Sequence, residues 1–241
     1  MKLGNLLFFS CLLFSKLSYA ALYPVTWDPS LQLKSLSDIP TLFDNSHFIA
    51  QSTIYVKEIK TKKGNQSREK TVSTCNEYFK AIHKNYEPEN NAEIASASFF
   101  VKKCGVLKVL SKAIPAKKSY LRKFDIRKDY GSLPASLIFP DISSHAEINT
   151  NKDQTVSEKF SDIKKDKFTE NFLQISSAQG AGTVDISVLA RGDFNHDGYD
   201  DMLLSITHYA YHFEGSYHRY DLVTVTRKQP ADKFFSQRVG D

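Results

Sequence analysis

Apolar side chains recur at every second position from residue 172 onward, and this period of two is typical of β-strands. The pattern predicts strands over residues 183–190, 202–213 and 220–227, where β-branched and aromatic residues are frequent. We therefore expect a small antiparallel sheet in the C-terminal part of the chain.

Residues 73–114 instead carry apolar side chains at helical spacing. Thr74 and Glu77 form a capping-box pattern at the start of a first predicted helix, which Pro88 ends. A second predicted helix spans residues 92–113, where apolar side chains recur near every 3.6 residues. The two helices are expected to pack as an antiparallel hairpin.

Two other segments carry weaker patterns. Residues 47–60 alternate in part between apolar and polar side chains and predict a further strand. Residues 145–171 are highly charged, so they predict either an exposed linker or a surface helix that presents Phe160, Ile163 and Phe168 to the rest of the protein.

These patterns together predict an α+β fold: a helical hairpin plus a C-terminal antiparallel β-sheet. We expect an α/β body over residues 21–165, which contains the hairpin of residues 73–114, and an antiparallel β module over residues 166–241. Most of residues 115–165 carries no clear pattern.

The first twenty residues read as a secretory signal peptide. Lys2 supplies the positive start, residues 6–14 form a short apolar run, and the small residues at 18–20 predict cleavage after Ala20. Acylation of Cys11, as in a lipoprotein, is disfavoured because the apolar run continues past it. We expect a periplasmic or secreted protein.

The cysteines support the same compartment. Beyond residue 20 the chain holds Cys75 and Cys104 and no third cysteine, and exported proteins keep disulfides oxidised. A disulfide between them would close a loop of about 30 residues and stabilise the fold by about 3–4 kcal/mol. The alternative is two separate buried thiols.

Charge excludes some partners. Without Lys2 and Lys16 the chain carries 30 basic and 27 acidic residues, which is too balanced to indicate nucleic-acid binding. The basic stretch at residues 57–70 is interrupted by acids and lacks aromatic residues that could stack on bases. No apolar run after residue 20 is long enough to span a membrane.

The stretch GDFNHDGYDD, residues 192–201, has the spacing of a calcium-binding loop. It follows a D-x-N-x-D-G-x-x-D pattern in which side-chain oxygens at odd positions point inward and Gly198 allows a sharp turn. Calcium needs six to eight such hard oxygen ligands. The alternative is a solvated acidic turn. The predicted Ca²⁺ ligands are Asp193, Asn195, Asp197, the carbonyl of Tyr199, and Asp201.

The stretch GDFNHDGYDDMLLS resembles the FG-GAP or VCBS-type repeat, in which such a loop joins two strands of a β-propeller blade. The resemblance implies that the five ligands above hold one structural calcium and that Asp200 points to solvent. An EF-hand is excluded because Leu204 stands at position 12, where that motif needs glutamate. The motif occurs once, whereas a propeller needs at least four blades, so we expect a single calcium-bound hairpin.

An aromatic stretch near the predicted turn after residue 213 offers a partner-binding surface, because tyrosine, histidine and arginine are frequent at interface hot spots. The alternative is that its tyrosine and phenylalanine side chains pack in the core. A zinc site at the two histidines lacks a third ligand. The candidate residues are Tyr217, Arg219, Tyr220, His208 and His212.

No familiar catalytic motif is present, neither G-x-S-x-G, nor H-E-x-x-H, nor a phosphate-binding glycine loop. We therefore expect a non-enzymatic, calcium-stabilised module that binds another protein, such as a periplasmic inhibitor or immunity protein that neutralises a secreted toxin. The alternatives are a periplasmic hydrolase of cell wall or lipid with structural calcium, and a surface-adhesion or carbohydrate-binding module.

Overall fold

The structure is a computed structural model that describes most of the chain beyond residue 21. The predicted signal peptide, the segment 46–53 and His212 lie outside the described residues. The described residues are 22–45, 54–58, 69–84, 86–88, 91–138, 154–178, 182–210 and 217–239.

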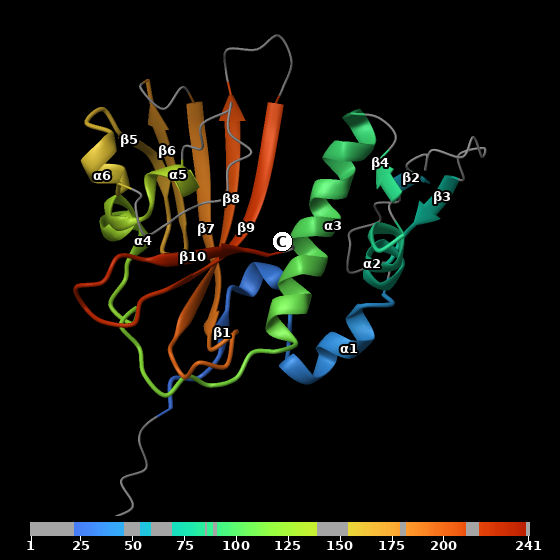
Figure 1. Cartoon of the computed structure of the whole chain (residues 1–241), viewed down its shortest axis with the longest axis horizontal. Helices are drawn as coiled ribbons and strands as arrows, with labels where there is room; N and C mark the ends of the chain where they lie inside the picture. The colour runs from blue at the N-terminus through green and yellow to red at the C-terminus, as the bar shows by residue number, and fades with distance from the viewer. Residues whose placement is uncertain are drawn as a thin grey trace, which may run out of the picture.

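A seven-stranded antiparallel sheet dominates the structure, in the order β10-β9-β8-β7-β6-β5, with β1 paired to β7 beside the end of β6 (Figure 1). The predicted C-terminal sheet is thus confirmed, and it also includes strands before residue 183. The strands are β1 (Thr26–Trp27), β5 (Lys164–Phe168), β6 (Phe172–Ser177), β7 (Gly182–Gly192), β8 (Asp201–Ala210), β9 (Tyr217–Thr226) and β10 (Phe235–Arg238).

Alternation along these strands buries both faces of the sheet, because successive side chains point to opposite sides. On one face Ile186 and Leu204 belong to a core that α4 (Ile126–Asp129), α5 (Ala135–Ile138) and α6 (Val156–Lys159) help to cover. On the other face Leu203 and Leu222 belong to a core with α3 (Asn91–Leu110). The remaining short helices are η1 (Pro29–Leu31), η2 (Leu36–Asp38), α1 (Ile39–Leu42) and η4 (Tyr130–Ser132).

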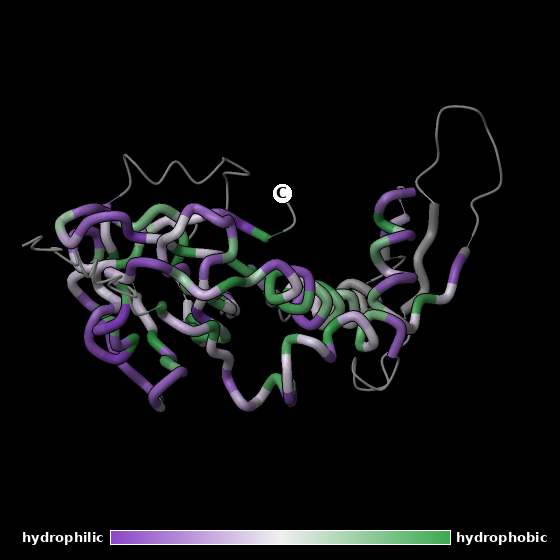
Figure 2. The backbone as a smooth tube through the Cα atoms, turned by 90° about the horizontal axis from the view of Figure 1, so that it is seen from below, coloured by the Kyte–Doolittle hydropathy of each residue, from purple (hydrophilic) through white to green (hydrophobic). Residues whose placement is uncertain are grey.

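A second, three-stranded sheet has the order β3-β2-β4 and packs with α2 (Cys75–Ile82). Figures 1 and 2 both show α3 between the large sheet on the left and this smaller unit on the right. The strand predicted over residues 47–60 is present as β2 in its described part. The strands are β2 (Ile54–Glu58), β3 (Glu69–Val72) and β4 (Tyr86–Pro88).

The first predicted helix begins as expected but ends early. Both halves of the capping box form: the Glu77 N–H donates to Thr74 Oγ1 at 3.2 Å, and the Thr74 N–H donates to Glu77 Oε2 at 3.2 Å. The prediction that the helix continues to Pro88 is wrong. Tyr86–Pro88 forms β4 because the residue before proline disfavours helix and because β2 offers a pairing partner at this edge.

The predicted disulfide is confirmed: Cys75, the first residue of α2, is bonded to Cys104 in α3. Both cysteines are fully buried in the core between α2, α3 and the large sheet. The disulfide therefore ties the small unit to the helix that packs against β9. In the described residues no helix is long and apolar enough to cross a membrane.

Of the charged segment 145–171, the structure describes residues 154–171, and these follow neither predicted alternative. Phe160 and Ile163 do pack into the core beside α6, which is only one turn long. Phe168, predicted to face the body, is 61% exposed because it belongs to the edge strand β5. The predicted domain boundary at residue 165 lies between Leu121 and Ile186 in the sequence. Both residues nevertheless belong to the same hydrophobic core.

The close packing of α3 on β9 depends on Gly105, where an added Cβ would lie 2.8 Å from Leu222 Cδ2. We expect Gly105→Leu to lower the free energy of unfolding by about 2–3 kcal/mol, because the buried contact cannot accept the extra atoms. Gly105→Ala is the matched control. It should change stability by less than about 1 kcal/mol, since the gain in helix propensity offsets a small shift of Leu222. Urea unfolding measures both, and an unchanged Gly105→Leu variant would contradict this packing.

Candidate calcium-binding loop

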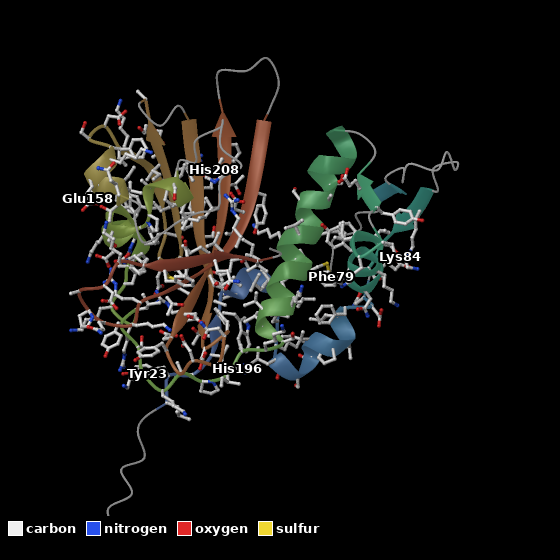
Figure 3. The ribbon with its side chains drawn as sticks, viewed as in Figure 1. Tyr23, Phe79, Lys84, Glu158, His196 and His208 are labelled. Carbon is white, nitrogen blue, oxygen red and sulfur yellow. A yellow bond between two sulfur atoms is a disulfide. The ribbon has the colours of Figure 1, made fainter. Side chains whose placement is uncertain are left out.

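The loop between β7 and β8 is held against residues 114–118 by backbone hydrogen bonds. Ile114 and Asp193 exchange two such bonds, of 3.1 and 2.9 Å, and the Gly198 carbonyl accepts from Lys117 N at 2.9 Å and from Lys118 N at 3.0 Å. His196 Nε2 also donates to the Lys112 carbonyl beyond the end of α3. Figure 3 shows His196 at the lower end of the large sheet, near α3. Because the loop is hydrogen-bonded to this neighbouring segment at Asp193, His196 and Gly198, its backbone is held in place.

The side-chain oxygens of Asp193, Asn195 and Asp197 accept hydrogen bonds from N–H groups of the loop itself. Asp193 accepts hydrogen bonds from Asp197 N at 3.1 Å and Gly198 N at 2.8 Å, while Asn195 Oδ1 accepts from Asp197 N at 3.0 Å. Asp197 Oδ1 accepts from Tyr199 N at 3.0 Å. Gly198 has a φ of +87°, in the left-handed region that glycine adopts without strain.

Asp201 closes the loop from the start of β8. Its carboxylate accepts from the Phe194 N–H at 2.9 Å and from the Thr226 hydroxyl at the end of β9. Burial, together with the charges of Asp197 and Asp193, raises the pKa of Asp201 to about 6, although the two hydrogen bonds act in the opposite direction. The negative charges of Asp193 and Asp197 therefore disfavour the ionised form of Asp201.

Asp197 has a cationic partner. Lys228 Nζ lies 2.9 Å from Asp197 Oδ2. Burial favours the neutral form of Asp197, but this contact and the hydrogen bonds from the loop outweigh it and lower the pKa of the carboxyl.

The implied exposure of Asp200 is wrong, because this residue is only 4% exposed. Its carboxylate accepts from Ser119 Oγ at 2.8 Å, and its N–H donates to the Lys118 carbonyl at 2.8 Å. Burial raises the pKa of this carboxyl. Asp200 points inward because residues 118–121 cover that side of the loop.

The possible ligand groups of the loop are of the type that calcium prefers, since they are carboxylate and amide oxygens in a tight turn. In the described residues no three histidine, cysteine or acidic side chains converge closely enough to hold a metal ion. The oxygens are directed instead to loop N–H groups, to Thr226 and to Lys228. To bind calcium through both carboxylate oxygens, Asp197 would have to give up its ion pair with Lys228. The calcium site therefore stays a prediction.

Of the predicted partner-binding residues, the structure describes the side chains of His208 and Tyr220, and these two do not share one exposed surface. His208 is buried, with Nε2 3.4 Å from Asp221 Oδ2, and Figure 3 places it near the upper end of β8. Tyr220 lies on the opposite face of the sheet, under Lys102 Nζ of α3 at 5.6 Å from the ring centroid. Tyr217 and Arg219 belong to β9, and their side chains are not described.

Sequence reasoning missed a surface beside the loop. The rings of Tyr120 and Tyr199 stack with centroids 6.2 Å apart, and Lys118 Nζ and Lys228 Nζ each lie 5.7 Å from the Tyr199 centroid. The signal available was the sequence KKSYLRK, which alternates cations and an aromatic residue at 117–123. We call this surface the tyrosine–cation patch: Tyr23, Lys118, Tyr120, Arg122, Tyr199 and Lys228.

Comparison with known proteins adds no family to this description. No protein-family model matches the chain, and no curated protein or solved structure matches it.

Proposed function

We propose that this chain is an exported, non-enzymatic module that binds another protein and is stabilised by one calcium ion. An inhibitor or immunity protein that covers a secreted toxin fits this description. The observation that carries the proposal is the loop between β7 and β8, whose acidic and amide side chains accept N–H groups of the loop around Gly198 and follow the spacing that calcium-binding loops use.

Calcium would act here as a structural ion. Its charge would offset the repulsion between Asp193, Asp197 and Asp201, of which the first and last are 1% exposed. The Tyr199 carbonyl and water would complete the shell. Because residues 114–118 are hydrogen-bonded to the same loop, the ion would also stabilise this neighbouring segment.

The tyrosine–cation patch is the surface we favour for the partner. Tyrosine and arginine are enriched at interface hot spots, because they combine a large contact area with polar groups. Tyr120 is 38% exposed, and Arg122 lies over the ring of Tyr23. The patch is built on the loop and the segment that calcium would fix, so partner binding should depend on calcium. Its positive charge favours an acidic partner surface.

Affinity capture from the exported proteins of the native host tests this proposal. The immobilised protein should retain a partner at about 1 mM calcium and lose it in EGTA. Replacing Lys118, Tyr120 and Arg122 by alanine should abolish retention.

The matched control replaces two exposed lysines of β5, Lys164 and Lys167, by alanine and so removes the same number of positive charges from another surface. This control should retain the same partner as the wild type. Equal retention by the patch variant, or equal retention in EGTA, would contradict the proposal.

A further inference from the structure

One face of the large sheet carries a line of polar side chains. The strand register places four polar residues side by side across β6, β7, β8 and β9, on the face toward α3, and all four are partly exposed. On the opposite face Ile186 and Ile206 are fully buried in the core. We call these four residues the polar row: Gln174, Asp185, Thr207 and Tyr220.

Lys102 of α3 lies over one end of the polar row. Its Nζ is 5.6 Å from the centroid of the Tyr220 ring, because α3 packs on β9 beside that end (Figure 1). Burial, with a smaller contribution from Lys103, lowers the pKa of the ammonium group, and Asp185 acts in the opposite direction. Among the described residues Lys102 has no hydrogen bond and no ion pair. The three N–H donors of this partly buried cation are therefore available to a ligand.

Asp185, in the middle of the polar row, is held by its neighbours. Its Oδ1 accepts from Gln174 Nε2 at 2.7 Å, and its Oδ2 accepts from the Tyr209 hydroxyl at 2.9 Å. Each carboxylate oxygen can accept a second hydrogen bond, and the Gln174 amide has a second N–H to donate. The Thr207 hydroxyl has no hydrogen bond within the described part of the chain. The polar row thus presents both donors and acceptors.

We propose that Lys102 and the polar row bind a small hydroxylated carboxylate, with the chemistry of a uronic acid. The carboxylate of the ligand accepts hydrogen bonds from the Lys102 ammonium group, where the charges are complementary. The ring hydroxyls each donate and accept, as the side chains of the polar row do. The proposal depends neither on calcium nor on the tyrosine–cation patch.

Both chemical features of the ligand are needed to use the whole site. A neutral sugar would leave the partly buried Lys102 without a counterion, and burying an unpaired charge is costly. An acid without hydroxyl groups would cover the polar row and leave its donors and acceptors without partners. A ligand that combines a carboxylate with several hydroxyl groups avoids both costs.

Titration of the ¹⁵N-labelled protein, followed by the chemical shifts of its amide groups, tests the proposal with three six-membered-ring probes: sodium glucuronate, glucose and sodium cyclohexanecarboxylate. We expect glucuronate to bind with a dissociation constant on the order of 1 mM and to shift amide signals of β7 and β8. Glucose lacks the charge and cyclohexanecarboxylate lacks the hydroxyl groups. Each should bind at least about fivefold more weakly.

Two variants separate the roles of the cation and the polar row. Lys102→Gln should weaken glucuronate binding roughly tenfold and leave glucose binding unchanged. Thr207→Val keeps the branched shape that suits a strand, and it should weaken glucuronate about threefold without changing the affinity for cyclohexanecarboxylate. Lys108→Gln, which removes an exposed charge from the same helix, is the matched control and should bind as the wild type does.

Each other outcome overturns the proposal. Equal glucuronate affinities for the wild type and Lys102→Gln exclude Lys102 as the anion-binding group, and equal weakening in Lys108→Gln assigns the effect to overall charge. Equal affinities for glucuronate and cyclohexanecarboxylate exclude the polar row. If Lys102→Gln does not fold, as judged from its amide spectrum, Thr207→Val decides. Absence of glucuronate binding to the wild type overturns this site and leaves the proposed function, which affinity capture tests, standing.

Discussion

Replacing Asp193 by asparagine should abolish the proposed calcium binding and should lower the free energy of unfolding by about 2–4 kcal/mol even in EGTA. The carboxylate accepts two loop N–H groups, one on each oxygen, and asparagine would turn an NH₂ group toward one of them. The residue is buried, so water cannot replace the lost hydrogen bond. Urea unfolding with and without calcium measures the stability, and calorimetry measures the binding.

The effect of calcium on the wild type gives a second readout of the same prediction. At calcium concentrations of about 100 times the dissociation constant, binding should add about 2.7 kcal/mol to the stability of the wild type and nothing to Asp193→Asn. Asp166→Asn, which changes an exposed acid on β5, serves as the control and should behave as the wild type does. If Asp193→Asn still gained stability from calcium, the loop would not be the binding site.

Replacing Cys75 and Cys104 together by alanine should lower the free energy of unfolding by about 3–4 kcal/mol. The disulfide closes a loop with a sequence separation of 29, which reduces the conformational freedom of the unfolded chain. Two buried sulfur atoms are also lost from the core between α2 and α3. Denaturant unfolding without reductant measures the change.

The wild type treated with dithiothreitol in denaturant should fall to a stability close to that of the double variant. A difference of less than about 1 kcal/mol between the oxidised wild type and the variant would contradict the expected stabilisation.

The elements that the sequence predicts well are those whose signals are local. The strands β7, β8 and β9 show their alternation over ten or eleven residues, and the start of α2 is marked by Thr74 and Glu77 within one turn. The disulfide follows from the number of cysteines and the expected compartment. Each of these predictions needs little knowledge of the rest of the fold.

The elements that the sequence does not predict are short and depend on distant partners. Residues 86–88 become β4 only because β2 offers an edge, and α4, α5 and α6 have four residues each, too few for a helical period to be visible. Phe168 is apolar, yet it lies in an edge strand with both faces exposed.

The candidate site likewise has a part that the sequence predicts and a part that it does not. The acidic spacing of the loop is readable in nine residues, whereas Thr226 and Ser119 reach it from 25 and 81 positions away. The burial of Asp200 and the position of Lys228 depend on those distant segments, so the motif alone predicts neither.

The pairing of β1 with β7 affects how the chain folds. Trp27 lies opposite Ala190 in the sheet, so β1 can pair only after a strand far along the chain has been synthesised. Contacts between such distant positions form slowly, because a long loop must close first. Until β1 and β7 have paired, the backbone of β7 at Ala190 and Arg191 lacks this neighbour, and such an open strand edge can pair with another chain instead.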